Sequence, residues 1–129
     1  MAHFHLDYSP NLKALVDMGA LCEAIRACAA EIEALPTPGI RVRAICVDHV
    51  AMADGKDIHG FVDMSIRLRG GRSREVKEDI VTRTFTCLKE QLAGVMETHS
   101  VALSAEIRDI DPELSPKFGT VRAHMEPSS

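Results

Sequence analysis

The feature that most constrains this fold is a strand–helix–strand pattern that occurs twice along the chain. The first half spans residues 2–52, the second spans residues 59–110, and a C-terminal tail (111–129) follows. The halves share the pattern without visible sequence identity. A helix that joins two strands of one sheet makes a right-handed crossover between parallel strands. We therefore predict one two-layer α/β (α+β) domain over residues 1–129, a mixed sheet with both helices on one face.

The first half reads as strand, helix and strand in turn. Histidine and phenylalanine alternate in residues 2–8, which end before Ser-Pro-Asn, as in a strand closed by a turn. Apolar residues then recur at steps of four and three, as on one helix face, at Leu21, Ile25, Cys28, Ile32 and Leu35. The Pro-Thr-Pro-Gly run at 36–39 predicts the end of that helix. Residues 40–52, rich in β-branched side chains, predict a strand.

The second half opens with strict alternation of apolar and polar residues. Its apolar face holds Val62, Met64, Ile66 and Leu68. Ser73 is expected to cap a second helix. The apolar face of that helix is expected at Val81, Phe85, Leu88, Leu92 and Val95. Residues 101–107 predict another strand, and residues 120–125 one more short strand.

Composition narrows the classes of function. The net charge is −4 and charged residues make up 26% of the chain, which argues against general nucleic-acid or membrane-surface binding. No apolar run approaches the roughly 20 residues of a membrane span, and no signal peptide is apparent. The four cysteines form no C-x-x-C pair, and we expect reduced thiols in a cytoplasmic protein.

Arginines concentrate in two places. Arg67, Arg69, Arg72 and Arg74 lie in one stretch that has no acidic residue between Asp63 and Glu75. A second pair, Arg41 and Arg43, opens the strand after the Pro/Gly turn. Guanidinium groups match carboxylates in a bidentate manner, so a site for a small carboxylate is one interpretation. A solvated strand face is the other interpretation, and for any single arginine it is the more common one.

Neither the histidines nor the cofactor-binding motifs indicate a functional site. His3 and His5 share a strand face, but no third ligand lies nearby, so we expect no metal site and interpret both as surface or sheet-packing residues. No phosphate-binding loop or dinucleotide fingerprint occurs, and we expect no cofactor.

Several short motifs together carry a family resemblance. They are HF at 3–4, GIRVR at 39–43, VD at 47–48, MADG at 52–55, FVDM at 61–64, GRS at 71–73 and ALSAEI at 102–107. Through most of its length the chain resembles the 5-carboxymethyl-2-hydroxymuconate Δ-isomerases of the tautomerase superfamily. The resemblance implies the repeated βαβ fold, a homotrimer, and a cofactor-independent isomerase of aromatic-compound degradation.

The resemblance also implies a mechanism. Family members use an amino-terminal proline, exposed when the initiator methionine is removed, as the base that moves a proton on an unsaturated 2-hydroxy carboxylate. Arg41 and Arg72 match the family's arginines, which bind the substrate carboxylates and polarise the 2-keto oxygen. Position 2 is Ala2 rather than proline, so the corresponding base would be the α-amine of Ala2 after loss of Met1.

Three functions stay open from the sequence. The first is the isomerase. The second is a relative that binds small carboxylates without turnover, because Ala2 replaces the proline. The third is a ferredoxin-like regulatory or RNA-binding module, which the acidic balance and 4% aromatic content disfavour. The residues assign no role to His3, His5, Arg43, Arg67 or Arg69.

Overall fold

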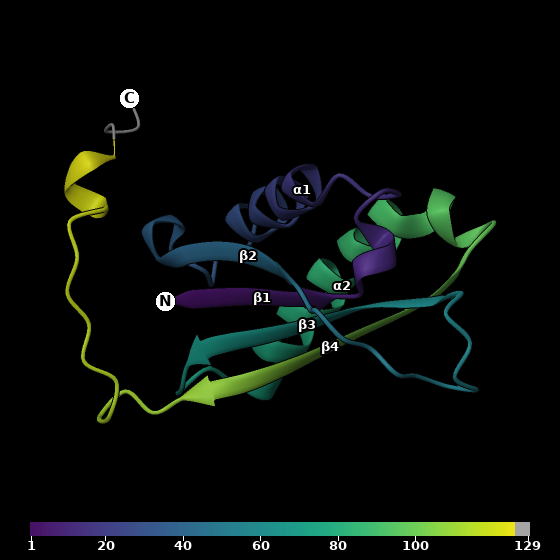
Figure 1. Ribbon diagram of the computed structural model, residues 1–129. Coiled ribbons are helices and arrows are strands. Elements are labelled where there is room, and N and C mark those ends of the chain that lie inside the picture. The colour runs from purple at the N-terminus through teal and green to yellow at the C-terminus, as the bar shows by residue number, and fades with distance from the viewer. Residues whose placement is uncertain (126–129) are drawn as a thin grey trace.

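The computed structural model describes residues 1–125 and has one mixed sheet against two helices (Figure 1). The strands are β1 (Ala2–Tyr8), β2 (Ile40–Cys46), β3 (His59–Arg69) and β4 (Ser100–Ile110), and the helices are α1 (Met18–Ala30) and α2 (Arg74–Met96). Short 3-10 turns occur at η1 (Pro10–Leu12), η2 (Thr37–Gly39) and η3 (Arg122–His124). In these described residues, no helix is long and apolar enough to cross a membrane.

The sheet joins the two halves through their first strands. Its order is β2-β1-β3-β4, with β1 parallel to β2, β3 parallel to β4, and β1 antiparallel to β3. Both helices lie on the same face of the sheet (Figure 1). The predicted mixed sheet with helices on one face is confirmed.

The core lies between the sheet and the helices. Side chains of β1 and β3 that point toward the helices are fully buried, including Phe4, Leu6, Val62, Met64, Ile66 and Leu68. The helices meet them with Leu21, Ile25, Ile80, Leu88 and Leu92. Burying one such side chain stabilises a fold by about 1.5–3 kcal/mol. The alternation predicted for residues 62–68 is therefore the alternation between core and open face.

The helix boundaries and faces differ in part from the prediction. α1 ends at Ala30, yet Ile32 and Leu35 are still buried, because a turn closed by a 3.0 Å Leu35 N–H bond to the Ile32 carbonyl carries them back onto the core. The predicted helical spacing therefore ran past the end of α1, because two buried residues of the following turn continue the same periodicity. The predicted cap is confirmed, since the Ser73 hydroxyl accepts from the Val76 N–H across 3.3 Å.

The buried face of α2 includes a residue that apolar spacing could not reveal. Ile80 and Thr84 are fully buried, whereas Val81 and Phe85 are half-buried at the edge of the core. The Thr84 hydroxyl donates to the Ile80 carbonyl across 2.7 Å, so its polar group needs no partner outside the helix. The predicted face was therefore rotated by one residue at its first two positions.

One predicted strand is shorter than expected, and another predicted strand is a 3-10 turn. β2 ends at Cys46 rather than at residue 52, because β1, its neighbour, ends at Tyr8; the Val47 N–H donates to the Tyr8 carbonyl across 3.0 Å just beyond the pairing. The strand expected at 120–125 is the 3-10 turn η3, which lies on a tail that leaves the sheet (Figure 1).

The open face of the sheet carries rows of polar side chains. His3 pairs in register with Arg41 on β2 and with Arg67 on β3, and Arg67 pairs with Arg108 on β4. Residues that pair directly in a sheet project on the same face. A row of three arginines with one histidine therefore crosses the open face near the start of β1.

Candidate active site

The topology gathers distant segments at one end of the sheet. Because β1 runs parallel to β2 and antiparallel to β3, Ala2 lies between Ile40, the first residue of β2, and Leu68, near the end of β3. The parallel pairing of β3 with β4 brings Ile110 opposite Arg69 at that same end. The first residues of the chain, the end of β3 and the exit of β4 thus surround one space.

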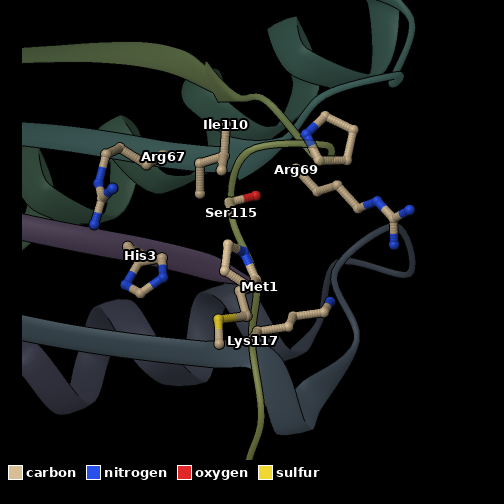
Figure 2. A pocket seen from close by; sticks show the side chains of 9 residues that line it. Met1, His3, Arg67, Arg69, Ile110, Ser115 and Lys117 are labelled. Atoms are coloured by element: carbon tan, nitrogen blue, oxygen red, sulfur yellow. The ribbon is translucent and has the colours of Figure 1, made fainter.

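That space is a cavity of about 490 Å³. Its lining comes from β1 and the residue before it, from β3, and from the segment after β4: Met1, His3, Arg67, Arg69, Ile110, Pro112, Ser115, Pro116 and Lys117. Figure 2 shows His3 beside Arg67 on one side of Met1, with Lys117 on the other. The volume lies within the usual range for a small-molecule site, about 300–1,000 Å³.

The charges that line the cavity have one sign. Arg67, Arg69 and Lys117 carry the positive charges, and the α-amine belongs to Met1. The lining that residues 1–125 provide contains no carboxylate. Such a concentration of cations in a chain of net charge −4 favours an anionic ligand. More than one cation suits a ligand with more than one carboxylate.

The first residue is packed closely into this end of the sheet. Arg41 Nη1 lies 3.0 Å from the Met1 sulfur. A Cβ added at Gly39 would lie 3.1 Å from the Met1 Cα, so a larger residue there would displace the Met1 backbone slightly. Ala2 follows as the first residue of β1, with its methyl group buried in the core. Its backbone nitrogen, which joins it to Met1, therefore lies at this end of the sheet.

A larger fraction of the amine at this position is unprotonated at neutral pH than of an ordinary α-amine. Burial lowers the pKa of the Met1 amine, and the charges of Lys117 and Arg72 lower it further, followed by Arg41 and Arg69. Lowering the pKa from an ordinary value near 8.0 increases the fraction that is unprotonated at pH 7. A poised amine beside several cations is a combination that suits a general base.

His3 lines this site, although the sequence alone assigned it no role. Burial lowers its pKa, and the charges of Arg67, Arg41 and Arg43 add to the effect, so its neutral form is favoured. Arg43 Nη1 lies 3.4 Å from His3 Nδ1. Because a guanidinium can only donate, this contact favours a neutral ring whose Nε2 carries the proton and can donate to a ligand. His5, two residues on, instead contacts Asp7 across 3.0 Å.

Arg41 and Arg72 stand near the amine without lining the cavity. Both contribute to the lowered pKa of the Met1 amine. The guanidinium of Arg72 donates to the carbonyl of Arg69 across 2.9 Å and to that of Ala34 across 3.1 Å. Arg41 is directed at the Met1 side chain. The neighbouring arginines, Arg67 and Arg69, occupy the lining in their place.

The composition of the C-terminal tail did not indicate that its residues line the cavity. Pro112, Ser115, Pro116 and Lys117 belong to a polar, proline-containing segment after β4. Only the pairing of β3 with β4 brings the exit of β4 to the end of the sheet where β1 begins. The signal was thus in the topology rather than in any motif.

Other groups considered for chemistry lie elsewhere. Within residues 1–125, no cluster of three or more His, Cys, Asp or Glu side chains could hold a metal ion. The four cysteines are free and half-buried, and burial raises the pKa of the Cys22, Cys28 and Cys87 thiols. A second cavity of about 360 Å³ lies at the opposite end of the sheet, lined in part by Ser9, Asn11 and His59.

Comparison with known proteins shows which family this chain is similar to. A family model described as 5-carboxymethyl-2-hydroxymuconate isomerase matches residues 2–125. A 5-carboxymethyl-2-hydroxymuconate Delta-isomerase of Escherichia coli is 32% identical over 123 residues, which cover 95% of this chain and 98% of that one.

Solved structures agree. A crystal structure of a 5-carboxymethyl-2-hydroxymuconate delta-isomerase superposes with a TM-score of 0.91 at 26% identity, covering 100% of this chain and 95% of that one. A 5-carboxymethyl-2-hydroxymuconate isomerase from Deinococcus radiodurans R1 gives 0.87 at 27% identity, covering 95% and 92%.

A more distant likeness concerns the fold alone. A fused 4-OT protein described as a symmetric trimer superposes with a TM-score of 0.64 at 16% identity, and covers 88% of this chain and 91% of that one.

Proposed function

The chain belongs to the 5-carboxymethyl-2-hydroxymuconate isomerase family, and on that premise we propose that it is a cofactor-independent isomerase acting on an unsaturated 2-hydroxy polycarboxylate. The substrate class is that of 5-carboxymethyl-2-hydroxymuconate, an intermediate type of aromatic-compound degradation. The observation that carries the proposal is an amine of lowered pKa at a cavity that the described residues line with cations and without a carboxylate.

The base in this proposal is the α-amine of Ala2 after removal of Met1. While Met1 is attached, the Ala2 nitrogen is an amide and cannot accept a proton. Once it is free, the amine lies among the same cations that lower the pKa of the Met1 amine. It takes a proton from one end of the conjugated system and returns one at the other, so the amine is regenerated and no co-reactant is consumed.

The cations divide two tasks in this proposal. Carboxylates of the substrate bind to the arginines at the cavity and to Lys117, which together can neutralise several negative charges. Negative charge builds on the oxygen at carbon 2 as the proton leaves. Arg41 and Arg72 are proposed to stabilise that charge, because both already act electrostatically on the amine.

A homotrimer completes the proposal. The fused 4-OT protein that this fold resembles is described as a symmetric trimer. In this chain no helix of residues 1–125 covers the open face of the sheet (Figure 1). Its rows of arginine, histidine and acidic side chains suit a polar interface between copies. Association through that face would also bury the half-exposed sheet residues.

The test is an activity assay on protein whose Met1 is shown by intact mass to be absent. A 2-hydroxymuconate-type dienol ketonises slowly without an enzyme, and its ultraviolet absorbance reports the rate. We expect a rate well above that background, proportional to enzyme concentration. A rate equal to the background would overturn the isomerase proposal.

A second candidate rests on one residue. Ala2 occupies the position of the family's proline, and a primary amine has a looser geometry than a ring nitrogen. If that amine does not act as the base, the protein binds small carboxylates without turnover. It is distinguished by binding of muconate-like carboxylates, measured by calorimetry, in a sample that shows no isomerisation.

A further inference from the structure

The C-terminal arm, residues 111–125, leaves the body of the protein after β4 and passes the N-terminus before it moves away (Figure 1). Four large apolar side chains on it are in contact with solvent: Leu114 is 81% exposed, Phe118 97%, Val121 52% and Met125 40%. Such a concentration of exposed apolar area on one short segment favours association with another surface.

Little in the same subunit fixes the position of the arm. Among the described residues, its hydrogen bonds beyond Ile110 join arm residues to one another, as in the Leu114 N–H bond to the Asp111 carbonyl at 3.2 Å. None of its side chains belongs to the hydrophobic core. The arm therefore lacks the two kinds of contact that normally hold a segment in place.

The same arm nevertheless forms one wall of the candidate active site. Pro112, Ser115, Pro116 and Lys117 line the cavity, and Lys117 supplies one of its positive charges (Figure 2). Phe118 is the next residue along the chain. A cavity that depends on this wall needs the arm in a defined position.

We propose that the arm docks through Leu114 and Phe118 on a second copy of this chain, and that this contact holds Lys117 in the candidate active site. The proposal rests on the proposed function, in which the assembly is a homotrimer and the cavity binds carboxylates. In a closed ring each copy gives one arm and receives one, so every site gains the same support.

The second copy offers surfaces suited to an extended segment. The strands β2 and β4 are the edges of the sheet, with backbone groups available on their outer sides. On β2 the side chain of Ile45 is 47% exposed, which gives an apolar contact beside that edge. A second copy is present in every assembly. It can therefore hold the arm in place at the candidate active site, although the subunit that carries the arm does not fix it.

The experiment compares Phe118→Asp with Ile58→Asp. Ile58 is 62% exposed just before β3 and is not on the arm, so it is a matched loss of an exposed apolar side chain. Sedimentation velocity measures the mass of the assembly. Calorimetry measures the affinity for propane-1,2,3-tricarboxylate, an unreactive tricarboxylate probe.

We expect Phe118→Asp to shift the assembly toward smaller species and to weaken probe binding by about tenfold, the effect of losing one charged contact. Raising the protein concentration should restore both. Ile58→Asp should match the wild type. Lys117→Ala should weaken the probe to the same degree while the mass of the assembly stays unchanged.

Two results would overturn the proposal. One is a Phe118→Asp protein with wild-type mass and affinity. The other is a smaller assembly whose affinity for the probe is unchanged. Phe118→Ala, compared with Ile58→Ala, gives the same test without a new charge. Failure of the isomerase assay is separate, since probe binding and assembly mass do not depend on turnover.

Discussion

The guanidinium of Arg72 donates a hydrogen bond to the backbone carbonyl of Ala34 across 3.1 Å, and so ties the turn before α2 to the turn after α1. A second bond, 2.9 Å long, reaches the Arg69 carbonyl. These two bonds fix the guanidinium close to the N-terminal amine before any ligand arrives. Arg72 thus has a structural role beside its proposed electrostatic role.

Arg72→Ala is expected to lower the free energy of unfolding by about 1–3 kcal/mol, because two carbonyl groups lose a charged donor. Urea denaturation measures this, and carboxylate affinity is measured on the same protein. Arg74→Ala is the matched control, since Arg74 pairs with Glu78 at the surface, where ion pairs contribute little. An unchanged unfolding free energy in Arg72→Ala would contradict the structural role.

Ala2→Pro is expected to raise the isomerisation rate by about tenfold or more, within the usual contribution of a well-placed general base. A ring nitrogen has fewer orientations than the amine of alanine. The measurement is kcat/KM on protein lacking Met1. Ala2→Gly keeps a primary amine and should give no increase. A proline variant no faster than the wild type would show that the amine is not the base.

The low pKa of His3 predicts how stability depends on pH. Burial and the charges of Arg67 and Arg41 make the folded state bind a proton less readily than the unfolded state, whose histidine titrates near pH 6.5. Below that pH the unfolded state binds more protons, so stability falls as the pH drops through 6.5 toward the lower folded value.

His3→Gln should therefore lose less stability than the wild type between pH 7.5 and pH 5.5, the two conditions at which urea unfolding would be compared. His124→Gln, on the exposed turn η3, provides the control for loss of one histidine. Equal pH dependence in His3→Gln and the wild type would count against the electrostatic environment described here.

Two glycines are expected to respond to alanine with opposite signs. At Gly60 a Cβ would lie 2.9 Å from Ser9 Oγ and 3.0 Å from Asn11 Oδ1, which hydrogen-bond to each other across 2.7 Å. Gly60→Ala should destabilise the fold by about 1–3 kcal/mol through overpacking. Gly94, within α2, has open space around it, and Gly94→Ala should stabilise by about 1 kcal/mol. Thermal or urea unfolding decides both.

The sequence sufficed for the parts of the fold that repeat regularly. Alternation at 62–68 predicted a strand with one buried face, and Ser73 predicted a helix start, because both depend on neighbouring residues alone. The end of β2 depends instead on where β1 ends, and the burial of Thr84 depends on a hydroxyl bonded within its own helix. Neither is visible as an apolar pattern.

The candidate site was predictable only in part for the same reason. Local charge pointed to the arginines, but which of them line the cavity depends on side-chain contacts such as that between Arg72 and Ala34. Lys117 joins the site through the exit of β4, more than a hundred residues after His3 in the chain. The buried face of a strand can be predicted from the sequence, whereas the segments that pack beside that strand cannot.

The strands β1 and β3, which begin the two halves of the chain, pair antiparallel at the centre of the sheet. A half-turn about an axis between these strands exchanges the two halves of the chain and carries the cavity at Met1 onto the cavity beside His59. The fold thus offers the same architectural position twice. The nitrogen at the start of β3 is always part of a peptide bond, whereas cleavage after Met1 would free the one at the start of β1. Two positions of the same shape can therefore differ in chemistry, because only one of them can have a backbone nitrogen that titrates.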